Sequence, residues 1–187
     1  MVTIILAHPW HGSFNKAIMD TIISKYEKEN TPYQTIDLHK DNFNPVYSEE
    51  ELSLYSQGGF IDPIVGRYQE LIKKSDELIF IFPIWWSGMP AILKGFFDKV
   101  LLKDFAFNYE NGWTPLLSID KTTIITTADQ TTESIINNCG NPIEGCLIPA
   151  ALNGVGIKNA TWINCGQVVK GSDEHRKDFL KKVESIV

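Results

Sequence analysis

The chain has 187 residues, 43% of them hydrophobic and 21% charged, which is typical of one globular domain spanning residues 1–187. A formal net charge of −6 argues against a generic nucleic-acid-binding or anionic-membrane surface. No apolar segment approaches the ~20 residues of a membrane-spanning helix, and no signal peptide precedes the first strand-like run. Three cysteines without metal-ligand spacing predict reduced thiols in a cytoplasmic protein without a metal site.

Apolar strand-like runs alternate with helical patterns along the whole chain. The strands are expected at residues 3–7, 33–38, 77–82, 121–127 and 160–165. The helices are expected at residues 15–29, 64–74, 91–101, within 143–153, and at 172–186 with Ser172 as the N-cap. Continuous apolar strands that alternate with helices predict a three-layer, doubly wound α/β domain with five parallel strands.

The turn after the first strand, residues 7–15, lacks the Gly-x-Gly-x-x-Gly pattern of dinucleotide-binding folds. We therefore expect the strand order 2-1-3-4-5. In that order the loops after strands 1, 3 and 4 lie side by side at the carboxyl edge, where open α/β sheets bind ligands. The segment 41–62 is too long for a simple connection, and we expect it to wrap a rim of the domain or reach a second subunit.

Each of these three loops carries chemistry suited to a planar, phosphorylated ligand. Ser13, Phe14 and Asn15 open a helix whose free N–H groups favour a phosphate, although Ser13 can also serve purely as a cap. Trp85 and Trp86 offer a flat surface, although one of them can instead fill the core. The threonine-rich turn after strand 4 suits the polar edge of a ring, or is simply a solvated turn. Together the loops favour a flavin over a free nucleotide.

The chain resembles the NAD(P)H:quinone oxidoreductase (DT-diaphorase-like) family over nearly its whole length. The most specific likeness is the pattern Phe-Pro-x-x-Trp-x-x-x-Pro-Ala-Ile-Leu-Lys-Gly at residues 82–95. The resemblance implies a flavodoxin-like fold and a ping-pong, two-electron hydride transfer from NAD(P)H through a flavin to a quinone or a related electrophile. FAD is the expected flavin, with FMN as the alternative.

By position, the resemblance also implies the site residues. Those for the flavin phosphates and ribityl chain are His8, Ser13, Phe14, Asn15 and Ala17. Those for the isoalloxazine ring are Pro83, Ile84, Trp85 and Trp86 along its edge, and Thr126, Thr127, Ala128 and Asp129 at its pyrimidine end. The substrate-binding residues are Trp86, Phe107 and Tyr109. Because Phe107 and Tyr109 match an aromatic pair that the partner subunit contributes, the resemblance implies a homodimer with shared sites.

The sequence departs from the family pattern at two places. Ala128 and Asp129 replace a pair of glycines, and residues 133–139 contain neither the tyrosine nor the histidine that relay charge in the well-studied members. No catalytic side chain is therefore assigned. Two other functions stay open: a flavodoxin-type electron carrier, and an ancillary regulatory subunit of a potassium-efflux system.

Overall fold

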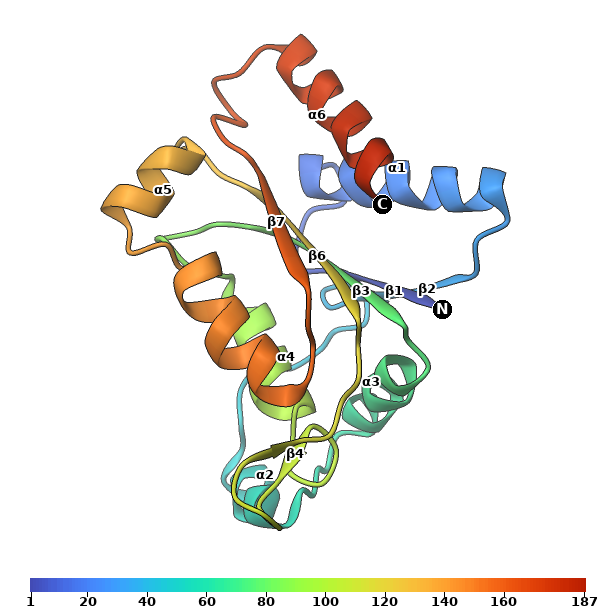
Figure 1. Cartoon of the computed structure of the whole chain (residues 1–187), viewed down its shortest axis with the longest axis vertical. Coiled ribbons are helices and arrows are strands. Elements are labelled where there is room, and N and C mark those ends of the chain that lie inside the picture. Colours follow the sequence, from blue (N-terminus) through green and yellow to red (C-terminus); the bar gives the residue numbers. More distant parts are fainter.

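A five-stranded parallel sheet forms the centre of the protein, for which a computed structural model describes all residues from Met1 to Val187. Its strands are β1 (Val2–Leu6), β2 (Tyr33–Asp37), β3 (Glu77–Pro83), β6 (Lys121–Thr127) and β7 (Ala160–Cys165). They lie in the order β2-β1-β3-β6-β7, and each neighbouring pair is parallel (Figure 1). The predicted fold class and strand order are confirmed.

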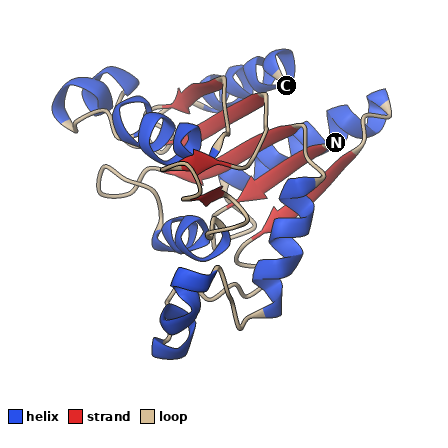
Figure 2. Cartoon of the chain, turned by 60° about the horizontal axis from the view of Figure 1, so that its bottom comes forward, coloured by secondary structure: helices blue, strands red, loops and turns tan.

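Helices cover both faces of this sheet (Figure 2). One face packs against α1 (Phe14–Glu29) and α6 (Asp173–Ile186) in a core that includes Ile18, Ile22 and Phe179. The other face packs against α3 (Pro63–Lys73), α4 (Ala91–Val100), α5 (Thr132–Asn138) and the π-helix η2 (Ile143–Leu152). Every residue of β1 is buried, which explains why its sequence is an unbroken apolar run.

Serine side chains cap two helices at the positions predicted from the sequence, Ser13 before α1 and Ser172 before α6. Ser13 Oγ accepts a hydrogen bond from the N–H of Lys16 (3.2 Å), and Ser172 Oγ accepts one from the N–H of His175 (3.1 Å). The weaker helix expected within 143–153 is present as η2, where Pro149 has no N–H to donate. No helix in the protein combines the length and the apolar character needed to cross a membrane.

The long segment 41–62 contains two elements that the sequence analysis missed, the helix α2 (Glu49–Leu54) and the short 3₁₀ helix η1 (Tyr55–Gln57). This segment lies against α4 of its own chain. Lys99, a residue of α4, donates from its Nζ to the backbone oxygens of Asn44 (3.0 Å) and Val46 (3.2 Å). The same amine pairs with Glu51 (2.8 Å). Beyond α4, β4 (Phe107–Asn108) and β5 (Thr114–Pro115) form a small antiparallel hairpin, which was also missed.

Candidate functional site

Two adjoining hollows open at the carboxyl ends of β1, β3 and β6. The first, about 490 Å³, lies beside the N-terminus of α1, and we call it the helix-end hollow. The second, about 800 Å³, lies between the Trp85–Trp86 loop and the loop after β6, and we call it the tryptophan-loop hollow. The two share the residues Ile84, Trp85, Ala128 and Asp129. The three loops that the sequence analysis selected therefore meet at one place.

Most of the expected site residues line one or both hollows. Those at the helix-end hollow are His8, Ser13, Phe14, Asn15, Pro83, Ile84, Trp85, Thr127, Ala128 and Asp129. Trp86 lines the tryptophan-loop hollow. Ala17 and Thr126 line neither, and Thr126 is buried with its Oγ accepting a hydrogen bond from Trp162 Nε1 (2.8 Å). Phe107 and Tyr109 stand apart from both hollows and pack with Trp113.

The start of α1 supplies donors and one unpartnered acceptor to the helix-end hollow. The first N–H groups of the helix, those of Phe14 and Asn15, have no partner within the helix, and they form its positive end. The Asn15 side chain is buried, and its Nδ2 donates to Thr127 Oγ1 (2.9 Å). Its Oδ1 is buried without any hydrogen-bond partner in the chain. A buried acceptor left unpaired costs free energy, so this atom indicates a place where a ligand donates a hydrogen bond.

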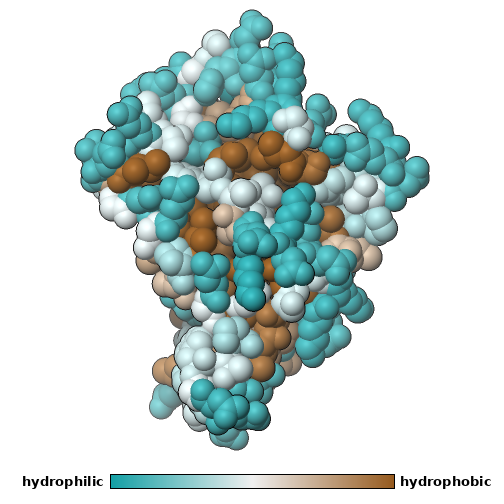
Figure 3. Space-filling view, in the orientation of Figure 1, coloured by the Kyte–Doolittle hydropathy of each residue, from teal (hydrophilic) through white to brown (hydrophobic).

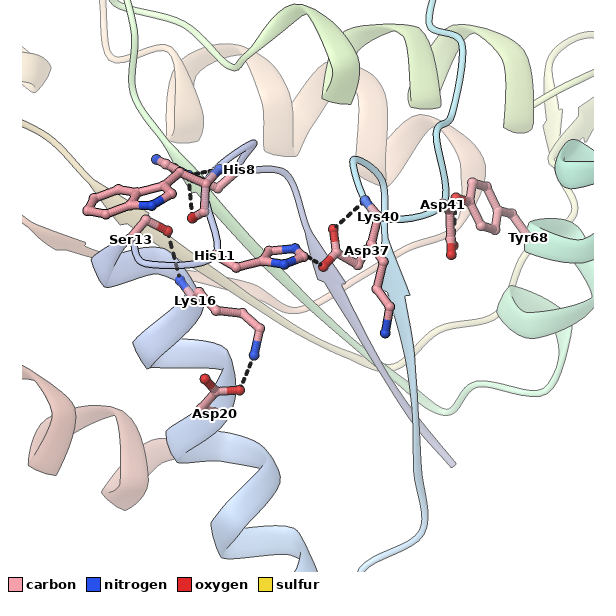
Figure 4. Close-up of polar contacts among 10 residues, drawn as sticks. His8, His11, Ser13, Lys16, Asp20, Asp37, Lys40, Asp41 and Tyr68 are labelled. Atoms are coloured by element: carbon pink, nitrogen blue, oxygen red, sulfur yellow. Dashed lines mark hydrogen bonds and ion pairs between the residues drawn. The ribbon is translucent and has the colours of Figure 1, made fainter.

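The histidines of the turn after β1 point in different directions. His8 Nδ1 lies within hydrogen-bonding distance of both the N–H (3.1 Å) and the carbonyl oxygen (3.2 Å) of Trp10, so it accepts from the first or donates to the second according to its tautomer. Burial lowers the pKa of His8; the backbone contact with Trp10 opposes this shift and the nearby His39 reinforces it. His11 instead contacts Asp37 Oδ2 at the end of β2 (2.8 Å), and Asp37 also accepts the N–H of Lys40 (Figure 4). His11 therefore ties the turn to β2.

The Trp85–Trp86 loop is a two-residue hairpin turn. Trp85 and Gly88 exchange both backbone hydrogen bonds (2.9 and 3.0 Å), and Trp86 (φ 49°) and Ser87 (φ 59°) between them are left-handed. Trp86 is fully exposed and Trp85 is 46% exposed, so neither tryptophan fills the core. A left-handed tryptophan without buried contacts is strained, and such strain clusters at ligand sites.

The loop after β6 presents backbone donors and one carboxylate. The N–H of Ala128 is used, because it donates to the carbonyl of Cys165 (3.0 Å). The N–H groups of Asp129 and Gln130, which also line the tryptophan-loop hollow, have no acceptor within the chain. The Asp129 side chain is exposed and makes no ion pair, so no cation of the chain neutralises its charge.

Four residues of the helix-end hollow were not predicted from the sequence, namely Trp10, Val168, Val169 and Arg176. Arg176 lies in the first turn of α6 and donates to the carbonyls of Val168 (2.9 Å) and Gly171 (2.7 Å). It therefore shapes the loop before α6 and brings a positive charge to the hollow. A cation in the first turn of a helix is unfavourable because it opposes the helix dipole. The position of Arg176 in the sequence, close after the cap Ser172, was therefore the one feature that could have indicated a role in the site.

The family model for the flavodoxin-like fold matches residues 1–187. An uncharacterized NAD(P)H oxidoreductase of Haemophilus influenzae is 33% identical over 184 residues, which cover 95% of this chain and 89% of that protein. NAD(P)H dehydrogenase (quinone) 1 of Rattus norvegicus is 33% identical over 122 residues, or 57% of this chain and 44% of the rat protein. The solved structure of an NAD(P)H:quinone oxidoreductase from Methanothermobacter marburgensis has a TM-score of 0.89 at 29% identity and covers 98% of this chain and 95% of its own. The chain therefore belongs to the flavodoxin-like fold family, in which its relatives include NAD(P)H and quinone oxidoreductases.

Proposed function

We propose that this protein is a flavin-dependent NAD(P)H:quinone oxidoreductase whose flavin lies along the helix-end and tryptophan-loop hollows. The observation that carries the proposal is the buried, unpartnered Oδ1 of Asn15 beside the positive end of α1. It lies in the same hollow as the exposed indole of Trp85. An anion site, a polar acceptor and a flat aromatic wall together suit the phosphate, the ribityl hydroxyls and the planar ring of a flavin.

The residues at the α1 end would hold the phosphate and the ribityl chain. The N–H groups of Phe14 and Asn15, the imidazole of His8 and the guanidinium of Arg176 are the available polar groups. Asn15 Oδ1 would accept a ribityl hydroxyl. Of the two flavins we propose FAD, because the hollow continues past the end of α1 to Val169 in the loop before α6.

The residues of the tryptophan-loop hollow would bind and orient the ring. When bound, the flavin supplies the hydride-accepting and hydride-donating chemistry that no side chain here provides. The free N–H groups of Asp129 and Gln130 would stabilise negative charge at the polar end of the ring, as preorganised backbone donors do. Trp86 offers its fully exposed face to a flat substrate, for which NAD(P)H and a quinone are the proposed partners.

We further propose a homodimer in which the exposed Tyr109 completes the site of the partner subunit, whereas Phe107 is buried in its own chain and stacks on Trp113, contrary to the expectation from the sequence. Supporting this, a separate apolar hollow of about 540 Å³ lies between α4, η2 and the β4–β5 hairpin, next to Phe107 and Trp113. Tyr109 and Trp113 are more than half exposed beside it. Hydrophobic surface interrupts the polar surface on the face that carries η2 (Figure 3). Exposed apolar patches of this kind usually form interfaces.

The three cysteines are free thiols, which supports our proposal that the protein works in a reducing compartment such as the cytoplasm.

The test combines cofactor analysis with a nearly isosteric substitution. We expect the purified protein to absorb as a flavoprotein with one flavin per chain, identified by mass spectrometry after release, and to consume NAD(P)H with a soluble quinone in equal amounts. Asn15→Asp places a negative charge beside the proposed phosphate site at the start of α1, so the Kd for the flavin should rise about tenfold or more. Asn138→Asp, on an exposed part of α5, is the control and should leave the Kd unchanged. Flavin retention in Asn15→Asp equal to that of the wild type would contradict the placement.

A further inference from the structure

The tryptophan-loop hollow carries one negative charge that nothing in the chain compensates. Asp129 is the only charged residue among the 7 that line this hollow. Its carboxylate is exposed, and no basic side chain pairs with it. Arg176, the one arginine or lysine at the adjoining helix-end hollow, pairs with Asp173 instead. A substrate that meets Trp86 therefore meets a free carboxylate as well.

The two tryptophans add aromatic surface to the same hollow. Trp86 is fully exposed and Trp85 is 46% exposed, and both line the hollow with Asp129. The face of an indole attracts a cation more strongly than any other aromatic side chain does. The backbone N–H groups that would attract an anion, those of Asp129 and Gln130, are the ones assigned above to the polar end of the flavin ring. Indole faces and a carboxylate together form a site suited to a flat organic cation.

The hollow also lacks a side chain that would supply a proton to a reduced substrate. No histidine, tyrosine, lysine or cysteine lines it. A neutral quinone that accepts a hydride becomes an anion, which the carboxylate of Asp129 repels until a proton arrives from water. A flat cation of the phenothiazinium class that accepts a hydride becomes neutral and needs no further proton. The carboxylate would thus attract such a substrate and would not retain its product.

We propose that the tryptophan-loop hollow selects planar organic cations as electron acceptors, and that Asp129 sets this preference. The inference rests on the proposed function, and it names the class of acceptor. In the overall step the acceptor gains two electrons and one hydrogen, which forms a new N–H or C–H bond, and its positive charge disappears. NAD(P)H supplies that hydride by way of the flavin and becomes NAD(P)⁺.

The first experiment compares three acceptors with flavin-loaded protein: methylene blue as the cation, naphthoquinone as the neutral acceptor, and a naphthoquinone sulfonate as the anion. Each kcat/KM is divided by that for naphthoquinone, which removes any general effect of the substitution on the flavin. In Asp129→Asn this ratio should fall about fivefold for methylene blue and rise about fivefold for the sulfonate, as expected for one close charge pair in water. Both changes should shrink to about twofold or less in ~1 M salt, because the charges are then screened.

The second experiment measures binding without turnover. Calorimetry gives the Kd of the oxidised flavoprotein for naphthyltrimethylammonium and for naphthalene sulfonate, two flat ions that accept no hydride. The wild type should bind the cation about fivefold or more tightly than the anion, and Asp129→Asn should lose most of that difference. Glu133→Gln removes the same charge from an exposed position that lines neither hollow, and this control should keep the wild-type ratios within about twofold.

Three results would overturn this inference and leave the flavin site intact. Equal changes for all three acceptors in Asp129→Asn would mean that the carboxylate acts only on the flavin. Equal effects of Glu133→Gln and Asp129→Asn would assign the preference to the net charge of −6. Wild-type protein that binds the two inert ions equally would have no preference for cations. Protein that holds no flavin, or that reduces none of the three acceptors with NAD(P)H, would instead refute the proposed function.

Discussion

Replacing Glu51 with glutamine removes the carboxylate that faces a buried lysine and tests how the segment 41–62 is held on α4. Lys99 is 2% exposed, and its amine lies 2.8 Å from Glu51 Oε1. The introduced glutamine would keep the shape of the side chain, and its Oε1 would keep the capping box with Ser48, so its NH2 group would face the Lys99 ammonium in place of a carboxylate oxygen. The substitution therefore removes both the charge and the acceptor that face Lys99.

The expected loss in the free energy of unfolding is about 3 kcal/mol, the lower end of the ~3–5 kcal/mol that breaking a buried ion pair costs. The lower end applies because Lys99 keeps its hydrogen bonds to the carbonyls of Asn44 and Val46. For a chain of 187 residues this corresponds to a fall in Tm of roughly 6–12 °C. Glu70→Gln, which breaks an exposed pair with Lys73, is the control and should cost less than about 1 kcal/mol.

The stabilisation by Glu51 should also depend on pH. Burial by itself would raise the pKa of Glu51, but the hydrogen bonds from Lys99 and Ser48 and the attraction of the Lys99 charge outweigh it and leave the pKa below its ordinary value of 4.5. A carboxylate whose pKa is lower in the folded protein than in the unfolded chain stabilises the fold fully at pH values above the unfolded-state pKa. This stabilisation is lost as the pH falls through the folded-state pKa. The difference between wild type and Glu51→Gln should therefore be largest above pH 4.5 and shrink below it.

Urea unfolding at several pH values measures both effects. A free energy of unfolding for Glu51→Gln within about 1 kcal/mol of the wild-type value at neutral pH would contradict this prediction, because breaking an exposed ion pair costs no more than that. It would show that Lys99 reaches water or another acceptor when the carboxylate is removed.

Four further predictions concern the site. Trp86→Gly should lower quinone reduction about tenfold while leaving stability equal or up to ~1 kcal/mol higher, because it removes a strained left-handed tryptophan; a large drop in Tm would contradict this. Asp129→Asn should raise the flavin midpoint potential and speed its reduction in stopped-flow experiments, since a carboxylate at the polar end of the ring opposes added negative charge. Cys139→Ser should leave that rate unchanged, because its thiol contacts Gln130 (3.7 Å) and lines neither hollow; a hundredfold loss with the flavin still bound would reveal a proton path through this loop. Light scattering should give the mass of two chains. Because Trp113 lines the apolar hollow proposed as the interface, Trp113→Glu should lower the measured mass toward that of one chain.

Much of the site could be predicted from the sequence because its parts are short and contiguous. Ser13 and Asn15 lie close together at a helix start, and Trp85 and Trp86 closely follow a buried strand. A parallel sheet brings the carboxyl ends of its strands to one edge whatever the side chains are, so the strand order was enough to bring the loops together. A helix cap likewise depends on a few neighbouring residues, and for that reason Ser172 was identified correctly.

Only the tertiary structure decided which other residues reach that edge. Thr126 and Thr127 are adjacent, but neighbouring residues of a strand point to opposite faces, and Thr126 bonds to Trp162 while Thr127 meets Asn15. Arg176 and Val169 join the site because α6 packs across α1, where Phe14 contacts Phe179 with 6.3 Å between ring centroids. Such pairings depend on how distant helices and loops pack in three dimensions, and no local pattern of charge or hydropathy encodes them.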